Sequence, residues 1–408
     1  MPLPDTRVES TISQPTAKSL LRPYFPAFDG LRGLAILVVC LAHYLNIAWP
    51  QLYPVLFWGS SAIDLFFVLS GFLITGVLYD ALPYPRFFRT FYTRRALRLL
   101  PPFVFVWAVL LVIALFLHPV WNLYNFSFLV CLGNLYLPAG IAGYHADPSF
   151  FYYVSASGHR FYATISHMWT LSQEEQFYFV WPLVLFFVRN RRLLIRLCLT
   201  GAALTLGLRV FLLLHADPRL LAADLLYYNP FTRFDAHLIG AALALIVRGG
   251  TFQRLALPRL RAITRSLFFA PILTIALLEF FLGRRWPLSH HHPLFTTVGF
   301  TFDCIATTGL MLMCIDPRTV ATRIFAHRSF TGIGRISYSF YLFHYLPMQF
   351  FVNQRDAFAS HHLLIAIPVL ALGATYLTAT LSYHYLERPV RSLSTRLAPN
   401  PASPKQPT

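Results

Sequence analysis

Long apolar runs, separated by short polar segments rich in arginine, make up most of this chain. Many runs are about 20 residues long, the length that a helix needs to cross the hydrocarbon core of a bilayer. The pattern therefore predicts an all-α fold, a polytopic integral membrane protein with about ten transmembrane helices. We place these spans at residues 31–49, 59–79, 99–118, 166–188, 193–215, 231–247, 266–283, 295–315, 336–352 and 363–386.

One further apolar stretch, residues 126–142, is not predicted to span the membrane. Gly133, Asn134 and Pro138 interrupt it. If it crossed the membrane, every later loop would change sides. We therefore expect a re-entrant or interfacial segment inside a long outer loop, residues 119–165.

The composition supports a membrane protein. Of the 408 residues, 56% are hydrophobic and 12% are charged, against roughly 25% charged in ordinary soluble domains. This excludes a soluble globular enzyme, a secreted disulfide scaffold and a disordered chain. The five cysteines lack paired spacing, and the three consecutive histidines 290–292 lack the ligand spacing of a helix, so we expect neither a disulfide nor a metal site.

The positive charges predict the orientation in the membrane. The formal net charge is +17, and most of the 33 Lys and Arg residues fall in alternate segments between the spans, as in cytoplasmic loops. This placement favours a membrane protein with both termini in the cytoplasm over a nucleic-acid-binding protein. We divide the chain into a cytoplasmic segment (1–27), a transmembrane domain (28–391) and a disordered cytoplasmic tail (392–408). The segments predicted outside hold Arg160, Arg219, Arg284, Arg285 and Arg355.

Two ionisable residues share one face of the first span. Arg32 and His43 are 11 positions apart, which is three helical turns plus about 20°, and a rise of about 16 Å. Ionisable residues inside a span indicate function by default. The pair suits a long substrate with an anionic head at the cytoplasmic mouth and a reactive tail in the membrane. A snorkelling arginine and a packing histidine are the structural alternative.

A second group begins the span at 166–188. Glu174 lies about 12 Å below the outer surface, and His43 lies at a similar depth. A carboxylate can orient an imidazole that acts as a general base, and it can stabilise the imidazolium. Glu174 and Glu175 point about 100° apart, so that at most one is expected to face His43. An ion pair that holds helices together is the alternative.

Other ionisable residues at membrane depth allow two interpretations. Asp64 lies about 8 Å below the outer surface, and Arg233 and Asp235 enter the membrane at a similar level. They form either the acceptor side of a polar cavity or a buried structural network; we favour the structural interpretation for Arg233 and Asp235. The sequence does not decide between packing and pore-lining roles for Glu279, Asp303 and His344.

A cluster of arginines precedes the third span. Arg94 and Arg98 are four positions apart and Arg95 and Arg98 are three apart, so that they can converge on one helix face. Convergent guanidinium groups suit phosphate. Topology signalling and contact with anionic membrane lipids are the alternative.

Six segments, taken together, resemble the membrane acyltransferase family 3, the family of bacterial polysaccharide O-acetylases. They follow the family's order along nearly the whole chain. Arg32 and His43 match the family's Arg-X10-His motif, and Trp169 to Tyr178 match a second motif, with Thr170 and Gln173 as departures. The segments are Phe28–His43, Asp64–Ile74, Arg94–Pro101, His167–Tyr178, Ile336–His344 and Glu387–Pro389.

The resemblance implies that His43 is catalytic, that Arg32 helps to hold acyl-coenzyme A, and that Glu174 is the functional carboxylate. The chain resembles the stand-alone type, without an extracytoplasmic hydrolase-like domain. We therefore expect a multi-pass O-acyltransferase of the cell inner membrane. It would move an acyl group from cytoplasmic acyl-coenzyme A to a hydroxyl of an extracytoplasmic glycan or related acceptor, and acetyl is the acyl group that we expect.

The residues expected to carry this reaction form two sets. Arg32, Arg94, Arg95 and Arg98 would hold the donor phosphates. His43, Glu174 and Asp64 form the catalytic set, and no metal is expected. Both direct transfer and an acyl-histidine intermediate fit. A transporter or flippase of a lipid-linked glycan is the alternative; inverted repeats would favour it, and the sequence shows none.

Overall fold

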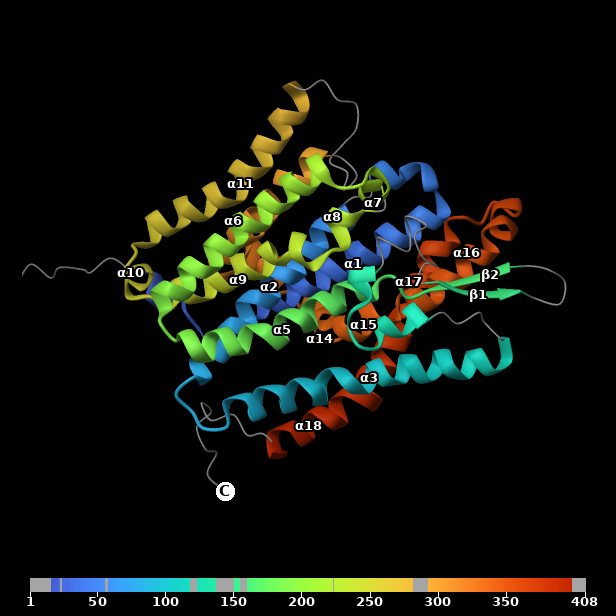
Figure 1. The fold of residues 1–408 in the computed structure, drawn as a ribbon, viewed down its shortest axis with the longest axis horizontal. Coiled ribbons are helices and arrows are strands. Elements are labelled where there is room, and N and C mark those ends of the chain that lie inside the picture. Colours follow the sequence, from blue (N-terminus) through green and yellow to red (C-terminus); the bar gives the residue numbers. More distant parts are fainter. Residues whose placement is uncertain are drawn as a thin grey trace, which may run out of the picture.

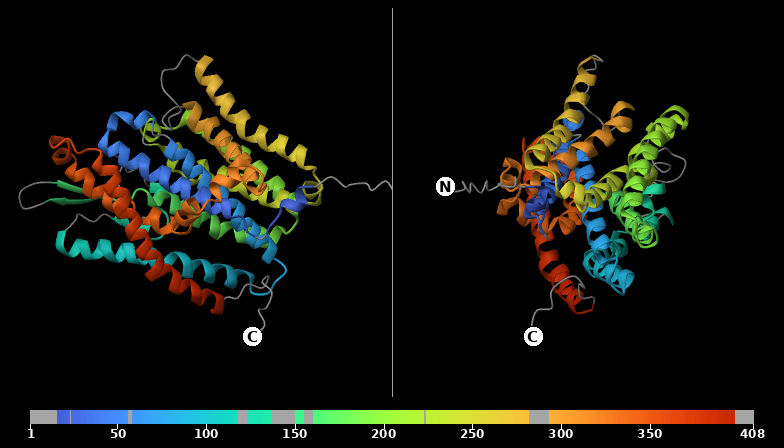
Figure 2. Two further views of the ribbon diagram at one scale, coloured as in Figure 1. Left: turned by 180° about the vertical axis from the view of Figure 1, so that it is seen from behind. Right: turned by 90° about the vertical axis from the view of Figure 1, so that its left-hand side faces the viewer.

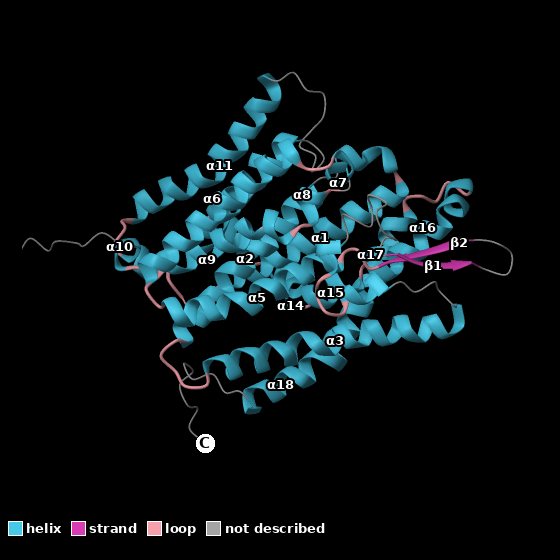
Figure 3. Cartoon of the chain, in the orientation of Figure 1, coloured by secondary structure: helices cyan, strands magenta, loops and turns pink. Residues whose placement is uncertain are grey.

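The computed structural model describes residues 16–22, 24–55, 58–117, 123–136, 150–154, 160–222, 224–281 and 293–397. Within these ranges the chain is almost entirely helical (Figures 1 and 3). The exception is a hairpin in which β1 (Phe150–Val154) pairs antiparallel with β2 (Arg160–Thr164). The predicted helical membrane class is confirmed, and the hairpin is an addition that the apolar pattern did not indicate.

The remaining elements follow one another as helices of very different lengths. The long helices are α1 (Pro26–Ala48), α2 (Trp58–Ala81), α3 (Phe87–Leu117), α5 (Met168–Val188), α6 (Arg191–His215), α9 (Phe234–Val247), α11 (Leu257–Phe281), α12 (Phe300–Ile315), α16 (Tyr345–Ser360) and α17 (Ala366–Ser382). The short helices are α7 (Pro218–Ala222), α8 (Leu225–Tyr228), α10 (Gly250–Gln253), α13 (Val320–Phe325), α14 (Arg328–Arg335), α15 (Ser337–Phe343) and α18 (Arg388–Leu397). The 3-10 turns are η1 (Ala17–Leu20), η2 (Pro50–Val55), η3 (Leu123–Phe128) and η4 (Pro230–Thr232), and the π-helical turns are η5 (Phe295–Gly299) and η6 (Tyr383–Glu387).

Seven helices of the described ranges are long and apolar enough to cross a membrane. The other three predicted spans coincide with helices that depart from a simple span. The helix α5 carries five consecutive polar residues, 172–176. The helix α9 has 14 residues, and the span at 336–352 is broken at His344 between α15 and α16. The number of ten spans and the side of the termini stay predictions. Of the interrupted segment, the structure describes residues 126–136, which form short helical turns.

The helices α1, α2 and α9 lie in the middle of the bundle (Figure 2). The contact between α2 and α9 depends on two glycines. A Cβ atom on Gly71 would collide with the backbone carbonyl of His237, and one on Gly240 with that of Val68. Small residues allow membrane helices to approach this closely and gain van der Waals contact. The close approach brings the polar residues of α9 against those of α2.

The arginines predicted to precede the third span lie within the helix that forms it. The helix α3 begins at Phe87, so that Arg94, Arg95 and Arg98 lie within it. It runs beside α18 along one edge of the bundle (Figures 1 and 2). The Tyr338 hydroxyl of α15 donates to the carbonyl of Leu99 at 2.9 Å and ties α3 to the centre.

Candidate active site

The cytoplasmic end of α1, as we predict its orientation, contributes Arg32 to a group of arginines. The charges of Arg32, Arg95 and Arg391 all act on Arg98, and the carboxylate of Glu387 compensates part of them. Three of these arginines were predicted to hold phosphate, and the fold brings them together from α1 and α3. Arg94 is partly exposed on the same helix and is not among the charges recorded around Arg98. Arg391, from α18, was not predicted.

Glu387 is held in place between these arginines and the bundle. Its Oε1 accepts a hydrogen bond of 2.5 Å from the Ser339 hydroxyl, and Ser339 lies 2.8 Å from the Ser382 hydroxyl. The π-helical turn η6 at the end of α17 turns this carboxylate inward, where only 5% of the residue is exposed. An inward carboxylate beside several arginines fixes their positions by charge-assisted hydrogen bonding and attraction.

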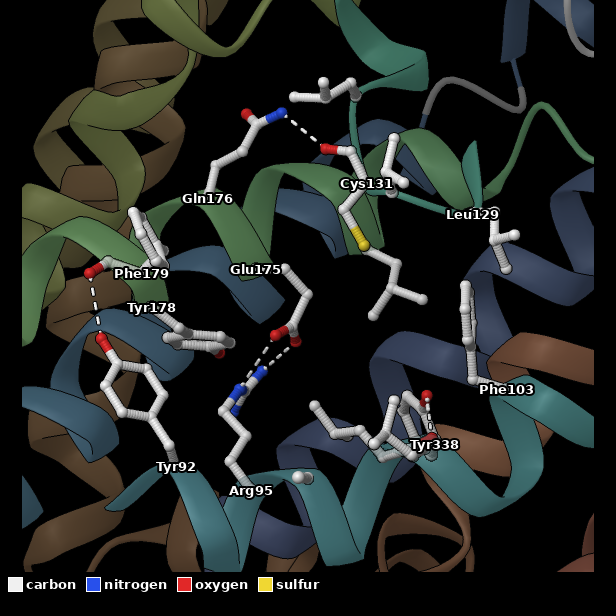
Figure 4. Close-up of a pocket in the computed structure, with 16 residues that line it drawn as sticks. Tyr92, Arg95, Phe103, Leu129, Cys131, Glu175, Gln176, Tyr178, Phe179 and Tyr338 are labelled. Carbon is white, nitrogen blue, oxygen red and sulfur yellow. Dashed lines mark hydrogen bonds and ion pairs between the residues drawn. The ribbon is translucent and has the colours of Figure 1, made fainter. Parts of the chain in front are cut away.

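Arg95 faces a cavity of about 560 Å³ between α3, α5 and residues 129–132 (Figure 4). Its Nη2 lies 2.7 Å from Oε1 of Glu175, and its guanidinium stacks 3.2 Å above the ring of Tyr178. Leu171 and Tyr338 line this cavity and also a smaller one of about 70 Å³ next to it. These two side chains therefore form the partition between the cavities.

The smaller cavity holds Arg32 and Glu174. The Glu174 carboxyl is hydrogen-bonded to Ser70, and the charges of Arg95, Glu175 and Arg32 act on it. The predicted divergence of the two neighbouring glutamates is seen directly, because each lines its own cavity. Glu174 therefore lies among the arginines. The contacts described for His43 are with other aromatic rings and do not include Glu174. The other residues around this cavity are Ile63, Phe66, Phe67, Thr170, Leu171, Ser337, Tyr338 and Tyr341.

His43 lies at the other end of α1, among aromatic rings. Its ring centroid is 5.5 Å from that of His344 and 5.2 Å from that of Tyr345. His167, at the start of α5, stacks on Tyr345 at 4.2 Å and lies 5.1 Å from His344. We call His43, His167 and His344 the histidine cluster. Within the described ranges no group of His, Cys, Asp or Glu side chains has the geometry to hold a metal ion.

The sequence did not indicate that these three histidines meet. His167 was quoted only as part of a motif, and His344 was left undecided. The sequence did contain one signal, because each histidine stands within or next to an apolar stretch. A polar side chain at such a position needs a partner inside the protein. His167 is 5% exposed and His344 is 0% exposed.

Asp64 belongs to a buried ion-pair network on α2, α6, α9 and α12. Its Oδ1 lies 2.5 Å from Nη2 of Arg233, and Nη2 of Arg209 lies 2.7 Å from Oδ2 of Asp235. All four side chains are at most 1% exposed. The Arg233 guanidinium stacks 3.7 Å above the ring of Phe300. The structural interpretation favoured for Arg233 and Asp235 fits these contacts, and the contacts recorded for Asp64 do not include His43.

Two groups singled out in the sequence lie outside what the structure describes: the histidines 290–292 and the side chain of Glu279. Asp303, in contrast, is described. Ser61, Asp64 and Arg233 act on its carboxyl group, which places it beside the ion-pair network.

Comparison with known proteins adds a family and several relatives. A family model described as "Acyltransferase domain" matches residues 25–384. The chain is 28% identical over 380 residues to the "Peptidoglycan O-acetyltransferase OatA" of Listeria monocytogenes, with 91% of this chain and 56% of the relative covered. It is 26% identical over 382 residues to the "O-acetyltransferase OatA" of Staphylococcus aureus, with 90% and 57% covered.

The chain thus spans little more than half the length of these curated relatives. No solved structure gives a significant match. The family model extends over most of the chain, including Arg32, His43, the α3 arginines and Glu174. The chain therefore belongs to this acyltransferase family, the membrane acyltransferase family 3 that its motifs resemble.

Proposed function

We propose that this protein is an O-acyltransferase of the cell inner membrane, which moves an acetyl group from cytoplasmic acyl-coenzyme A to a hydroxyl of an extracytoplasmic glycan. The observation that carries the proposal is the arrangement along α1. One end of the helix enters a group of four arginines, and the other end places His43 in the histidine cluster. The names of the relatives, which are O-acetyltransferases, support acetyl as the group and a glycan as the acceptor.

The arginine group suits the donor. Coenzyme A carries its phosphates at the end remote from the thioester, and guanidinium groups grip phosphate through paired hydrogen bonds. With the phosphates held by Arg32, Arg95 and Arg98, the pantetheine arm extends along α1. Arg32 and His43 are about 16 Å apart along the helix, so that an extended arm brings the thioester toward the histidine.

His43 supplies the base. It takes the proton from the acceptor hydroxyl while the hydroxyl oxygen forms a bond to the thioester carbonyl carbon. The carbon–sulfur bond then breaks, and the imidazolium returns the proton to the coenzyme A thiolate. An acyl-histidine intermediate fits the same residues, with the acyl group passing first to His43 and then to the hydroxyl.

The test is thioester cleavage by purified protein. Wild-type protein with acetyl-coenzyme A and a soluble N-acetylglucosamine oligomer should release free thiol and yield an O-acetylated sugar. The His43→Ala protein, purified at the same folded yield, should do neither. Transfer that is unaffected by this substitution would remove His43 from the mechanism, and absence of acetyl-coenzyme A cleavage by wild-type protein would contradict the donor.

A further inference from the structure

The break between α15 and α16 makes backbone carbonyls available inside the protein. The last carbonyls of a helix have no partner within it and must be satisfied by other groups. At this break, two histidine rings approach two successive carbonyls. Nδ1 of His344 lies 2.5 Å from the carbonyl oxygen of Tyr341, and Nε2 of His167 lies 3.3 Å from that of Leu342.

These two contacts fix where the ring protons are. A carbonyl oxygen only accepts hydrogen bonds, so the ring nitrogen that faces it carries the hydrogen. In the neutral imidazole the other nitrogen then carries the lone pair. Nε2 of His344 and Nδ1 of His167 are thus acceptors. Both are buried, and neither has a hydrogen-bond partner among the described residues.

The backbone of His344, whose ring lies beside that of His43, is held by a hydrogen bond from α1. The hydroxyl of Tyr44, the residue after His43, donates to the His344 carbonyl at 2.9 Å and lies 2.6 Å from the Thr375 hydroxyl. The backbone of His344 is therefore fixed to α1 and α17. A buried acceptor that is held this firmly can position a side chain that lies beside it.

The distance between the rings suits a hydrogen bond. The centroids of His43 and His344 are 5.5 Å apart and the rings are inclined by 36°. An N–H···N bond of about 3 Å, with roughly 1 Å from each nitrogen to its ring centre, requires about 5 Å between centroids. The observed centroid distance exceeds this value by about 0.5 Å.

We propose that His344 is the positioning residue of His43. Its Nε2 accepts the N–H of His43, so that the opposite nitrogen of His43 presents its lone pair to the acceptor hydroxyl. When His43 takes the hydroxyl proton, the hydrogen bond to His344 becomes charge-assisted and stronger. His344 stays neutral, and the proton leaves His43 for the thiolate of coenzyme A. The inference rests on the proposed function of His43, and it gives His43 a neutral partner where the sequence suggested a carboxylate.

Two conservative substitutions separate this role from a structural one. The amide of asparagine can occupy the place of Nδ1 and keep the bond to the Tyr341 carbonyl. The amide of glutamine reaches the place of Nε2 and keeps an acceptor for His43. If His344 positions His43, His344→Gln should retain kcat within about threefold, and His344→Asn should lower it roughly tenfold to a hundredfold. KM for acetyl-coenzyme A should stay unchanged in both, since neither substitution touches the arginine group.

The measurement is kcat and KM of detergent-purified full-length protein, with acetyl-coenzyme A and the N-acetylglucosamine oligomer as probes. Equal kcat values for the two variants, or a more active His344→Asn protein, would overturn the inference while leaving His43 as the base. Wild-type turnover that does not depend on His43 would overturn the proposed function together with it.

A third variant covers the case in which either protein fails to fold. Tyr44→Phe removes the hydroxyl that holds the His344 carbonyl and leaves all ring nitrogens in place. A kcat lowered roughly threefold to tenfold, with unchanged KM, would support the positioning role. Wild-type kcat in Tyr44→Phe would overturn it.

Discussion

Two buried polar regions of this protein differ in how their charges are matched. In the ion-pair network, Asp64 faces Arg233 and Asp235 faces Arg209, so that both arginines have a counter-charge. In the histidine cluster, His344 and His167 each bond a backbone carbonyl and leave one ring nitrogen unpaired. The two regions therefore differ in the pairing of charges and not in the presence of unpaired atoms, since Oδ2 of Asp64, Nε of Arg209, and Nε and Nη1 of Arg233 are also buried without a hydrogen-bond partner among the described residues.

The difference indicates which region serves the fold and which serves a ligand. An uncompensated buried charge costs several kcal/mol, so a network of paired charges is retained once its members are buried. An unpaired buried acceptor costs about 1–3 kcal/mol. A protein that keeps two such acceptors beside His43 gains nothing from them in stability, whereas a substrate or a rotated His43 can use them.

The largest effect on activity should follow from His43→Ala in the histidine cluster. We expect kcat to fall by a factor of roughly 10³ or more, because the substitution removes the general base. The folded yield, measured by size-exclusion chromatography, should stay at the wild-type level. His215→Ala, which removes an exposed histidine from the end of α6, is the control. If His43→Ala lowered the yield and left turnover per folded molecule intact, the contrast between the regions would fail.

In the paired region, the effect should appear in stability. Asp235→Ala leaves the Arg209 guanidinium buried without its counter-charge, which should lower the free energy of unfolding by about 3–5 kcal/mol. Asp80→Ala is the matched control. Asp80 lies 2.6 Å from Arg248 in a partly exposed ion pair, which should contribute at most about 1 kcal/mol to stability. Thermal unfolding of the purified proteins compares the two.

Asp64 tests the boundary between the two regions. The sequence placed it in the catalytic set, whereas its recorded partners are Arg233 and Asp303. We expect Asp64→Asn to lower the midpoint of thermal unfolding more than it lowers kcat per folded molecule. A stable Asp64→Asn protein without turnover would return Asp64 to the reaction.

A smaller effect is expected for single arginines around Arg98. Arg32→Ala and Arg98→Ala should each raise KM for acetyl-coenzyme A about tenfold, since a hydrogen bond to a charged group contributes about 1.5–3 kcal/mol. The effect should shrink at high salt. Arg254→Ala is the control; its side chain is exposed and bonds the Gly250 carbonyl of its own turn. Unchanged donor affinity in both variants would mean that these arginines only set topology.

The smallest effect should separate the two glutamates. Glu174 lies with Arg32 in the smaller cavity, and the charges of Arg95 and Arg32 act on it. Glu174→Gln should therefore raise KM for the donor roughly threefold to tenfold by loosening these arginines. Glu175→Gln should change it less than threefold, since its pair with Arg95 is partly exposed. A large fall in kcat for Glu174→Gln at unchanged KM would instead support the predicted contact between Glu174 and His43.

The sequence by itself determined the helical membrane class and the common face of Arg32 and His43. Both depend on local periodicity: run length predicts a span, and 3.6 residues per turn fix the relative direction of two side chains on one helix. The same local geometry predicted the divergence of Glu174 and Glu175.

The tertiary structure alone decided which side chains meet. Depth in the membrane placed Glu174 and His43 at one level, but depth does not fix the side of the bundle on which a helix lies or the direction in which its face points. Those depend on close packing, such as the contact of α2 and α9 at Gly71 and Gly240. The break at His344 has the same cause: an apolar run predicts a span, whereas contacts between distant segments, Tyr44 with His344 and His167 with Leu342, satisfy the backbone where the helix ends.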